Sequence, residues 1–250
     1  MGALHEGHLK LIQKSLAECD FTVVSIFVNP SQFNNPEDLK LYPRNETEDR
    51  VKLQKAGCSV LFLPSVDEIY PNGYEYYTIE LGTLDQVLEG KYRPGHFKGV
   101  AMVVERLFRI VEPQRAFFGE KDFQQIAVIR RMVQLRKLDV EIRTVATVRS
   151  SEGLALSSRN ARLSAKGRDE ALIIHKTLLA GKTWINSGIE LSAVRKKMLE
   201  LFAAGNLELE YLCLADERSL EETESSPLCR AFIAAYCEGV RLIDTMKMTD

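Results

Sequence analysis

Hydrophobic residues along the chain alternate between a helical and a strand period. In residues 7–19 the spacing of Leu9, Ile12 and Leu16 places them on one helical face and turns the polar residues outward. Residues 21–28 follow as a continuous apolar run, which is typical of a buried parallel strand. The chain therefore opens with a predicted amphipathic helix followed by a predicted strand.

The same alternation continues along the first part of the chain. Gly57 is a C-cap residue that ends a predicted helix over 47–56. Further helices are predicted at 103–110 and 126–135, and further strands at 59–64, 115–119 and 140–148. Because strands and helices alternate, we expect an α/β fold with a doubly wound, Rossmann-like parallel sheet. Ligands of such sheets bind at the carboxyl ends of the strands.

The alternation ends near residue 147, and the remainder of the chain predicts a different architecture. Amphipathic helices are expected at 164–185 and 190–204, and strands at 207–214 and 230–236. We therefore predict two domains. A Rossmann-like domain spans 1–147, and a smaller C-terminal α+β lid domain spans 148–250.

Composition and charge narrow the functional class. The chain has 250 residues, of which 45% are hydrophobic and 27% charged, and its formal net charge is −2. This near-neutral balance argues against a nucleic-acid binder, which would carry a clustered basic excess. No apolar stretch approaches the roughly 20 residues of a membrane span and no signal segment opens the chain, so we expect a cytoplasmic protein without a membrane partner. The five cysteines form no C-x-x-C pair and indicate neither disulfides nor a zinc site.

Two histidines flank a glycine where the first helix begins. His5 and His8 are three residues apart and project from the same side, and Gly7 leaves the backbone open to a ligand. The free amides and the positive dipole end of a helix favour a phosphate, to which both imidazoles can donate hydrogen bonds. An isolated H-x-G-H also arises by chance, so the phosphate site is at this point a hypothesis.

Polar groups collect at two later loops of the first domain. Lys121, Asp122 and Gln125 follow a predicted strand directly, which places them at the ligand-binding edge of the sheet. Arg93 and His96 lie in R-P-G-H before a long helix, where a solvated turn is an equally good interpretation. Both loops are candidates for the same site as the two histidines.

A serine-rich loop follows the last strand of the first domain. Ser157, Ser158 and Arg159 offer hydroxyls and a guanidinium fork suited to phosphate oxygens. The same stretch also fits a flexible linker between domains. Both interpretations can hold, because a mobile loop between domains can close over a nucleotide.

The ordered set of motifs resembles one known family over essentially the whole chain. The motifs are M-G-A-L-H-E-G-H, F-V-N-P-S-Q-F, Y-P-R, R-P-G-H-F-x-G-V, F-F-G-E-K-D-F-Q-Q, L-S-S-R-N and the late R-L-I-D. They resemble the pantothenate synthetase (pantoate-β-alanine ligase) family of the nucleotidyltransferase superfamily. The resemblance implies a ligase that joins pantoate to β-alanine through a pantoyl adenylate and releases pyrophosphate and AMP. In this family the serine-rich loop is the counterpart of a K-M-S-K-S loop.

The resemblance also implies roles for individual residues. Four match the family's catalytic groups, namely His5, His8, Lys121 and Arg159, with His8 at the position of the assigned proton donor. Residues at or beside the family's ATP contacts are Met1, Gly2, His5, Gly7, His8, Gly119, Glu120, Lys121, Asp122, Val148, Leu156, Ser157, Ser158 and Arg159.

Glutamines are implied to bind the substrates. Gln32 and Gln125 match the family's pantoate-binding positions, and Gln32 is also expected to contact β-alanine. Asn29, Arg93 and His96 lie in the matching substrate loops. An amide positions the pantoate carboxylate without neutralising it, whereas a bidentate arginine would blunt its nucleophilicity.

ATP and Mg²⁺ are the implied cofactors. Mg²⁺ is expected to bind mainly to the phosphates and to keep several waters, with Asp49 as a possible protein contact. The resemblance further implies a homodimer whose other partners are small molecules.

One departure from the family concerns the start of the chain. Members carry a segment ahead of the Met-Gly that holds the first strand of the sheet, whereas this chain begins at Met1. We therefore expect a sheet that lacks its usual N-terminal strand, as a misassigned start codon would produce. Two alternatives follow, a related adenylyltransferase and a non-catalytic nucleotide-binding remnant.

Overall fold

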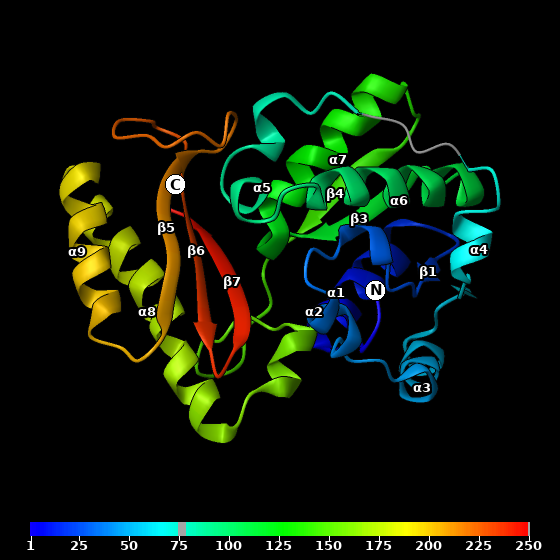
Figure 1. Ribbon diagram of the computed structural model, residues 1–250, viewed down its shortest axis with the longest axis horizontal. Helices are drawn as coiled ribbons and strands as arrows, with labels where there is room; N and C mark the ends of the chain where they lie inside the picture. The colour runs from blue at the N-terminus through cyan, green and yellow to red at the C-terminus, as the bar shows by residue number, and fades with distance from the viewer. Residues whose placement is uncertain (75–78, 250) are drawn as a thin grey trace. The chain divides into compact units, whose positions relative to one another are not determined.

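The computed structural model of the chain describes residues 1–74 and 79–249 (Figure 1). The polar, tyrosine-rich segment near residue 75 lies partly outside these residues. Two compact units make up the chain, Met1–Ala146 and Thr147–Asp250.

The first unit contains two pairs of parallel strands among its helices. Its α-helices are α1 (Glu6–Glu18), α2 (Pro36–Lys40), α3 (Glu46–Ala56), α4 (Val66–Ile69), α5 (Glu89–Tyr92), α6 (His96–Val111) and α7 (Phe123–Arg136). Short 3-10 helices lie at η1 (Pro30–Gln32), η2 (Gly82–Asp85) and η3 (Glu120–Asp122). Strand β1 (Val23–Ser25) pairs with β2 (Val60–Phe62), and β3 (Arg115–Gly119) pairs with β4 (Glu141–Val145), both in parallel.

Local sequence explains where the helices of this unit begin and end. The Asn45 side chain caps α3 by accepting from the Glu48 N–H, and Gly57 ends that helix at φ +80°. In α1 the predicted apolar face is confirmed, because Ile12 is buried and Leu9 and Leu16 pack beside it. These residues form a small core with Val24 of β1 and Leu53 of α3, which fixes the start of α1 against the strands.

The larger core of the first unit lies around α6 and α7. Val100 and Phe108 of α6 and Ile129 and Met132 of α7 are buried there. Phe118 of β3 packs against the same cluster. The R-P-G-H and G-E-K-D segments directly precede α6 and α7. Because these helices are closely packed in the core, they give both segments a rigid support.

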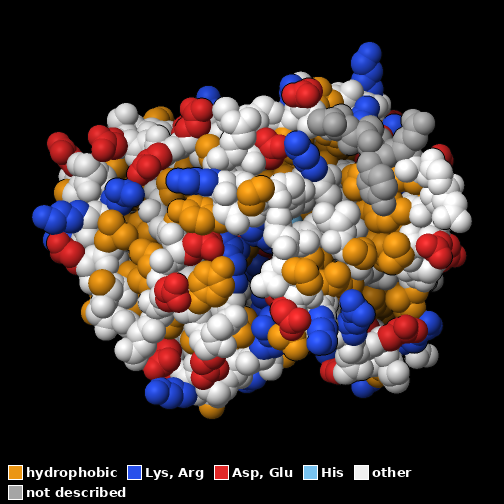
Figure 2. All heavy atoms as spheres, in the orientation of Figure 1, with side chains coloured by type: hydrophobic (Ala, Val, Ile, Leu, Met, Phe, Trp, Pro, Cys, Tyr) orange, Lys and Arg blue, Asp and Glu red, His pale blue; other side chains and the backbone are white. Residues whose placement is uncertain are grey.

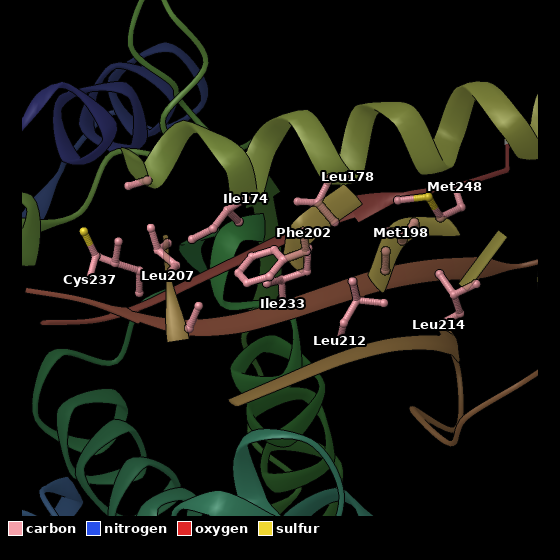
Figure 3. Packing of buried hydrophobic residues seen from close by; sticks show 14 of the residues in the cluster. Ile174, Leu178, Met198, Phe202, Leu207, Leu212, Leu214, Ile233, Cys237 and Met248 are labelled. Atoms are coloured by element: carbon pink, nitrogen blue, oxygen red, sulfur yellow. The ribbon is translucent and has the colours of Figure 1, made fainter. Parts of the chain in front are cut away.

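The second unit is an antiparallel sheet covered by two helices. It contains η4 (Ser158–Arg162), α8 (Ala165–Asn186), α9 (Leu191–Ala203) and the strands β5 (Glu208–Asp216), β6 (Cys229–Cys237) and β7 (Val240–Lys247) in the order β5-β6-β7. Figure 3 shows Ile174 and Leu178 of α8 directed toward the strands. Phe202 of α9 lies beside Ile233 of β6 in the same core.

The α/β class expected from the sequence is confirmed, with parallel pairs in the first unit and a separate antiparallel sheet in the second. Two elements differ from expectation. The strand predicted at 21–28 is limited to β1, and Phe21 is 64% exposed because it precedes the strand in the connection from α1. Strand β7 was not predicted at all. Its signal is the hairpin turn at Glu238 and Gly239, where φ is +50° and +72°.

On the face drawn in Figure 2, acidic and basic side chains are interspersed. Within the described residues, no helix has both the length and the apolar character needed to cross a membrane.

Candidate active site

The two histidines of H-E-G-H are bound to the first turn of α1 and to each other. His5 is the N-cap residue, and its Nδ1 accepts from the Gly7 N–H at 3.1 Å. The Nδ1 of His8 accepts from the His5 N–H at 3.3 Å, and the two ring centroids are 4.0 Å apart. Because each Nδ1 accepts, each neutral imidazole carries its proton on Nε2. Both rings therefore present Nε2–H as their remaining donor.

Burial keeps both imidazoles neutral. It lowers the pKa of His5 to about 4, and the charge of Lys121 contributes to the same shift. The pKa of His8 is lowered to about 2, first by burial and then by His5 and other nearby positive groups. Near pH 7 the pair thus consists of neutral hydrogen-bond donors. Neither ring is a cation that could neutralise phosphate, so that role falls to other residues.

Asp49 of α3 holds the segment that precedes these histidines. Its Oδ2 accepts from the Ala3 N–H at 2.8 Å, and its Oδ1 accepts from the Leu4 N–H at 2.6 Å. Lys52 donates to the Leu4 carbonyl oxygen at 2.6 Å. Ala3 has φ +48°, a left-handed conformation that costs about 1 kcal/mol for an L-residue. Asp49, which is 1% exposed, thus stabilises a strained backbone directly ahead of His5.

Replacing Asp49 is expected to reduce stability strongly. Asp49→Ala leaves two backbone N–H groups without their charged acceptor, so the free energy of unfolding should fall by about 3 kcal/mol. Urea denaturation measures this change. The control is Glu48→Ala, which removes only exposed contacts with Lys52 and Asn45 and should cost less than about 1 kcal/mol. Equal losses in the two variants would contradict the role given to Asp49.

Gln32 ends η1, and Asn29 orients its side chain. Asn29 is buried, and its Nδ2 donates to Gln32 Oε1 at 3.3 Å and to the Gly99 carbonyl oxygen at 3.2 Å. Asn29 Oδ1 accepts from Ser31 Oγ at 2.9 Å and from the Tyr70 hydroxyl at 3.0 Å. With its oxygen bound to Asn29, the Gln32 amide presents Nε2 as a donor. The structure therefore gives Asn29 a positioning task beside Gln32.

Arg93 and His96 contact the backbone of Gln32. His96 is buried, and its Nδ1 donates to the Gln32 carbonyl oxygen at 2.8 Å. Arg93 Nη1 donates to His96 Nε2 at 3.2 Å and lies 3.7 Å from a carboxylate oxygen of Glu89, which is also buried. The solvated-turn interpretation of this loop is thus wrong, because the loop is tied to Gln32 through buried hydrogen bonds.

Stability should fall as the pH is lowered, in part because of His96. Burial lowers the pKa of His96 to about 4, whereas an unfolded histidine has a pKa near 6.5. The unfolded chain therefore binds more protons between these values, and stability is present above about pH 6.5 and is lost toward pH 4. For this residue the loss from pH 7 to pH 5 is about 2 kcal/mol. In urea denaturation, the difference between the free energies of unfolding at pH 7 and pH 5 should be smaller in His96→Gln than in the wild type by about 2 kcal/mol. An unchanged difference would contradict this contribution of His96.

The G-E-K-D segment lies at the end of β3. Gly119 ends the strand, and Glu120, Lys121 and Asp122 form η3 directly before α7. Lys121 Nζ lies 3.1 Å from Asp122 Oδ1. The charge of Lys121 lowers the pKa of both His5 and His8, so this ammonium belongs to the same group of side chains.

Two adjacent glutamines of α7 have different surroundings. Gln124 is buried, its Nε2 donates to the carbonyl oxygens of Leu84 and Val87, and its Oε1 accepts from the Glu89 N–H. Gln125, which is predicted to bind pantoate, is half-buried. The sequence indicated a role only for Gln125. A Q-Q pair by itself carries no sign of which glutamine is buried, so the role of Gln124 could not be predicted. Gln124 instead holds η2 and α5 against α7.

The serine-rich loop belongs to the second unit. The Leu156 N–H donates to the Val148 carbonyl oxygen at 2.9 Å, which closes the base of the loop. Ser157 Oγ accepts from the Arg159 N–H at 3.3 Å and caps η4, and Ser158 is buried. The predicted linker is therefore an ordered hairpin and a short helix.

Among the described residues, no group of three or more His, Cys, Asp or Glu side chains is arranged to bind a metal ion. Both oxygens of Asp49 accept from backbone amides. The Mg²⁺ contact expected for Asp49 stays a prediction. Because both Asp49 oxygens already accept hydrogen bonds, the site fits a Mg²⁺ ion held mainly by phosphates better than one held by the protein.

Comparison with known proteins identifies relatives along the whole chain. The pantoate-beta-alanine ligase family matches residues 1–247. A pantothenate synthetase of Porphyromonas gingivalis is 46% identical over 256 residues, covering 100% of this chain and 90% of the relative. One of Paracoccus denitrificans is 46% identical over 252 residues, covering 100% of this chain and 88% of the relative.

Solved structures agree with these relatives. The pantothenate synthetase of Thermus thermophilus has a TM-score of 0.97 at 41% identity, covering 100% of this chain and 91% of that one. The pantoate-beta-alanine ligase of Francisella tularensis, complexed with beta-gamma ATP and beta-alanine, has a TM-score of 0.83 at 35% identity, covering 99% and 87%. The identities, the coverage and the matched residues together show that this chain belongs to the pantoate-beta-alanine ligase family.

Proposed function

We propose that the protein is an ATP-dependent ligase that condenses pantoate with β-alanine. In the first step the pantoate carboxylate attacks the α-phosphorus of ATP, and pyrophosphate leaves. In the second step the β-alanine amine attacks the acyl carbon of the pantoyl adenylate, loses a proton, and displaces AMP. The observation that carries this proposal is the family match over residues 1–247, which includes all the motif residues in their order.

The first unit would align two anions and stabilise the charge that develops between them. We assign to His5 and His8 the donation of Nε2–H to phosphate oxygens whose charge grows in the transition state. Because burial keeps both rings neutral, each Nδ1 can accept from the backbone while Nε2 carries the proton that is donated. Lys121 supplies the positive charge that the histidines lack. Gly7 and Gly119 carry no side chain that would keep the nucleotide from the backbone, and Met1, Gly2, Glu120 and Asp122 are assigned beside them to the ATP site.

Gln32 and Gln125 would bind pantoate. The orientation that Asn29 imposes on Gln32 supports this, because the Nε2–H of Gln32 can donate to a carboxylate or a hydroxyl oxygen. Arg93 and His96 would act through the Gln32 backbone rather than by touching substrate. The positioning of pantoate for in-line attack is then the main catalytic contribution of this loop.

The second unit would bind phosphates through Ser157, Ser158 and Arg159, with the backbone of Val148 and Leu156 near the adenosine. Mg²⁺, when bound on the triphosphate, supplies neutralisation of its charge. We further propose that residues 148–250 act as a lid domain and that the protein works as a homodimer in the cytoplasm.

The finer arrangement of the first unit is also a proposal. We infer that β1–β2 and β3–β4 belong to one doubly wound sheet. A further strand on the edge of β1 could join the two pairs, and two hydrogen bonds support pairing at that edge, from the Met1 amine to the Ser25 carbonyl oxygen at 3.0 Å and from the Phe27 N–H to the Met1 carbonyl oxygen at 3.1 Å. They are the pattern of a residue paired in parallel with Ile26. A strand leading into Met1 would thus extend the β1 edge.

An assay of AMP release tests the proposed function. The chain is incubated with ATP, Mg²⁺ and pantoate, with and without β-alanine. Continuous AMP release only when both substrates are present is the expected result. An adenylylated product without AMP would favour a related adenylyltransferase. Binding of ATP without turnover, also in a chain extended upstream of Met1, would favour the non-catalytic alternative.

A further inference from the structure

Asp244 of the R-L-I-D sequence forms a buried ion pair within the second unit. Arg149 Nη1 lies 2.5 Å from Asp244 Oδ2, and Arg149 Nη2 donates to Asp244 Oδ1 at 3.0 Å. The side chain of Asp244 is 3% exposed. Such a bidentate pair fixes the guanidinium plane in one orientation. Asp244 itself is fixed because it also accepts from the Thr245 N–H at 2.8 Å.

Arg149 lies at the base of the serine-rich loop. It forms an antiparallel bridge with Ala155, and its Nη1 also donates to the Gly153 carbonyl oxygen at 3.2 Å. Between them the Ser150 N–H donates to the Leu154 carbonyl oxygen at 2.8 Å, and the Gly153 N–H donates to the Ser150 carbonyl oxygen at 3.0 Å. One guanidinium therefore joins β7 to the tip and the base of the hairpin 149–155.

His175 of α8 supports the same hairpin from a second side. A Cβ placed on Gly153 would lie 2.2 Å from the His175 ring, so ring and backbone are in direct contact. Gly153 has φ +109°, which other residues rarely adopt. The hairpin is thus held against α8 as well as β7 by contacts within the protein itself.

We infer that Asp244 is a positioning residue for the phosphate-binding loop: through Arg149 it holds the hairpin 149–155 so that Ser157, Ser158 and Arg159 are ordered before a nucleotide binds. This inference rests on the proposed function for the role of the loop. The hairpin leads directly into the N-cap of η4, which is Ser157. An anchored hairpin therefore fixes where η4 begins.

The expected consequence is an effect on ATP affinity rather than on turnover. If the loop is competent only part of the time, the apparent dissociation constant for ATP rises by the inverse of that fraction. Once ATP is saturating, the loop is ordered in every complex. The pantoate site, in the first unit, is not affected.

Asp244→Asn tests the inference. The asparagine Oδ1 can still accept from the Thr245 N–H, but the bidentate pair with Arg149 is lost. We expect the KM for ATP to rise about tenfold, with kcat and the KM for pantoate changed less than about twofold. Amide hydrogen exchange should show about tenfold faster exchange at Ser150, Gly153 and Leu156, whose N–H groups close the hairpin.

Glu210→Gln is the matched control. Glu210 of β5 accepts from Arg241 of β7 at 2.5 Å, and the Arg241 and Arg149 side chains are both 18% exposed. Arg241 lies on the same strand as Asp244, but its partner Glu210 lies on β5 and not on the hairpin 149–155. Glu210→Gln should lower stability without changing the KM for ATP or the exchange of the hairpin amides. A more conservative variant, Arg149→Lys, keeps the charge and loses the bidentate geometry, and should shift the same two measurements.

The outcomes separate this inference from the proposed function. Unchanged exchange of the hairpin amides in Asp244→Asn would overturn the inference, and so would a fall in kcat equal to the rise in KM. Equal changes in the KM for ATP and in hairpin amide exchange in Glu210→Gln would also overturn the inference, since they would indicate general destabilisation. A wild-type chain that releases no AMP would refute the proposed function, while the exchange data would still decide whether Asp244 anchors the loop.

Discussion

Replacing His8 by asparagine is expected to lower kcat for adenylate formation about 10²- to 10³-fold, the usual effect of removing one preorganised donor from a developing negative charge. The asparagine Oδ1 lies near the position of His8 Nδ1 and can still accept from the His5 N–H. The start of α1 should therefore remain intact. What is lost is the donor at the position of Nε2.

His8→Gln provides the matched comparison. Its amide nitrogen reaches the position of Nε2, so the donor is retained while the acceptor for the His5 N–H is lost. We expect His8→Gln to keep at least about tenfold more activity than His8→Asn, and to have a less stable α1. Single-turnover measurement of pantoyl adenylate, together with thermal unfolding, separates the two effects. Equal activity in both variants would show that the donor is not the important feature of His8.

Lys121→Met is expected to lower kcat about 10³-fold, within the range known for cationic groups that stabilise phosphoryl transfer. Methionine keeps most of the apolar stem and removes the charge. In this site the loss is not compensated by the histidines, because burial keeps both of them neutral. Lys52 also acts on both rings, but its effect on the pKa of each is smaller than that of Lys121, which makes Lys121 the better placed cation.

The same variant has a second readout that does not need turnover. Because the Lys121 charge lowers the pKa of His5, removing it should raise that pKa from its value of about 4. Proton NMR of the imidazole signals in the free protein measures the shift. Lys98→Met, at an exposed position on α6, is the control and should change neither kcat nor the pKa of His5. A Lys121→Met enzyme with nearly full activity would remove Lys121 from the catalytic group.

Local patterns were enough to predict the elements around the site. The apolar spacing of α1, the glycine at the end of α3 and the strand at 115–119 all have short-range causes, and the structure confirms each of them. Residues at strand ends, such as Lys121, could be selected because parallel strands place their carboxyl ends at one edge. Strand β7 was missed because its strand pattern includes Asp244 at a buried position, which reads as polar and exposed in a single sequence.

The sequence by itself determined the family, the order of the motifs and the residue types that can bind phosphate and carboxylate. These follow from spacing along the chain and from side-chain chemistry. Only the tertiary structure decided which polar groups hold other parts of the chain in place. Asp49, Asn29 and Asp244 are bound to partners 46, 70 and 95 positions away in the chain. The same is true of protonation, because the neutral state of His5 and His8 results from burial by residues distant in sequence.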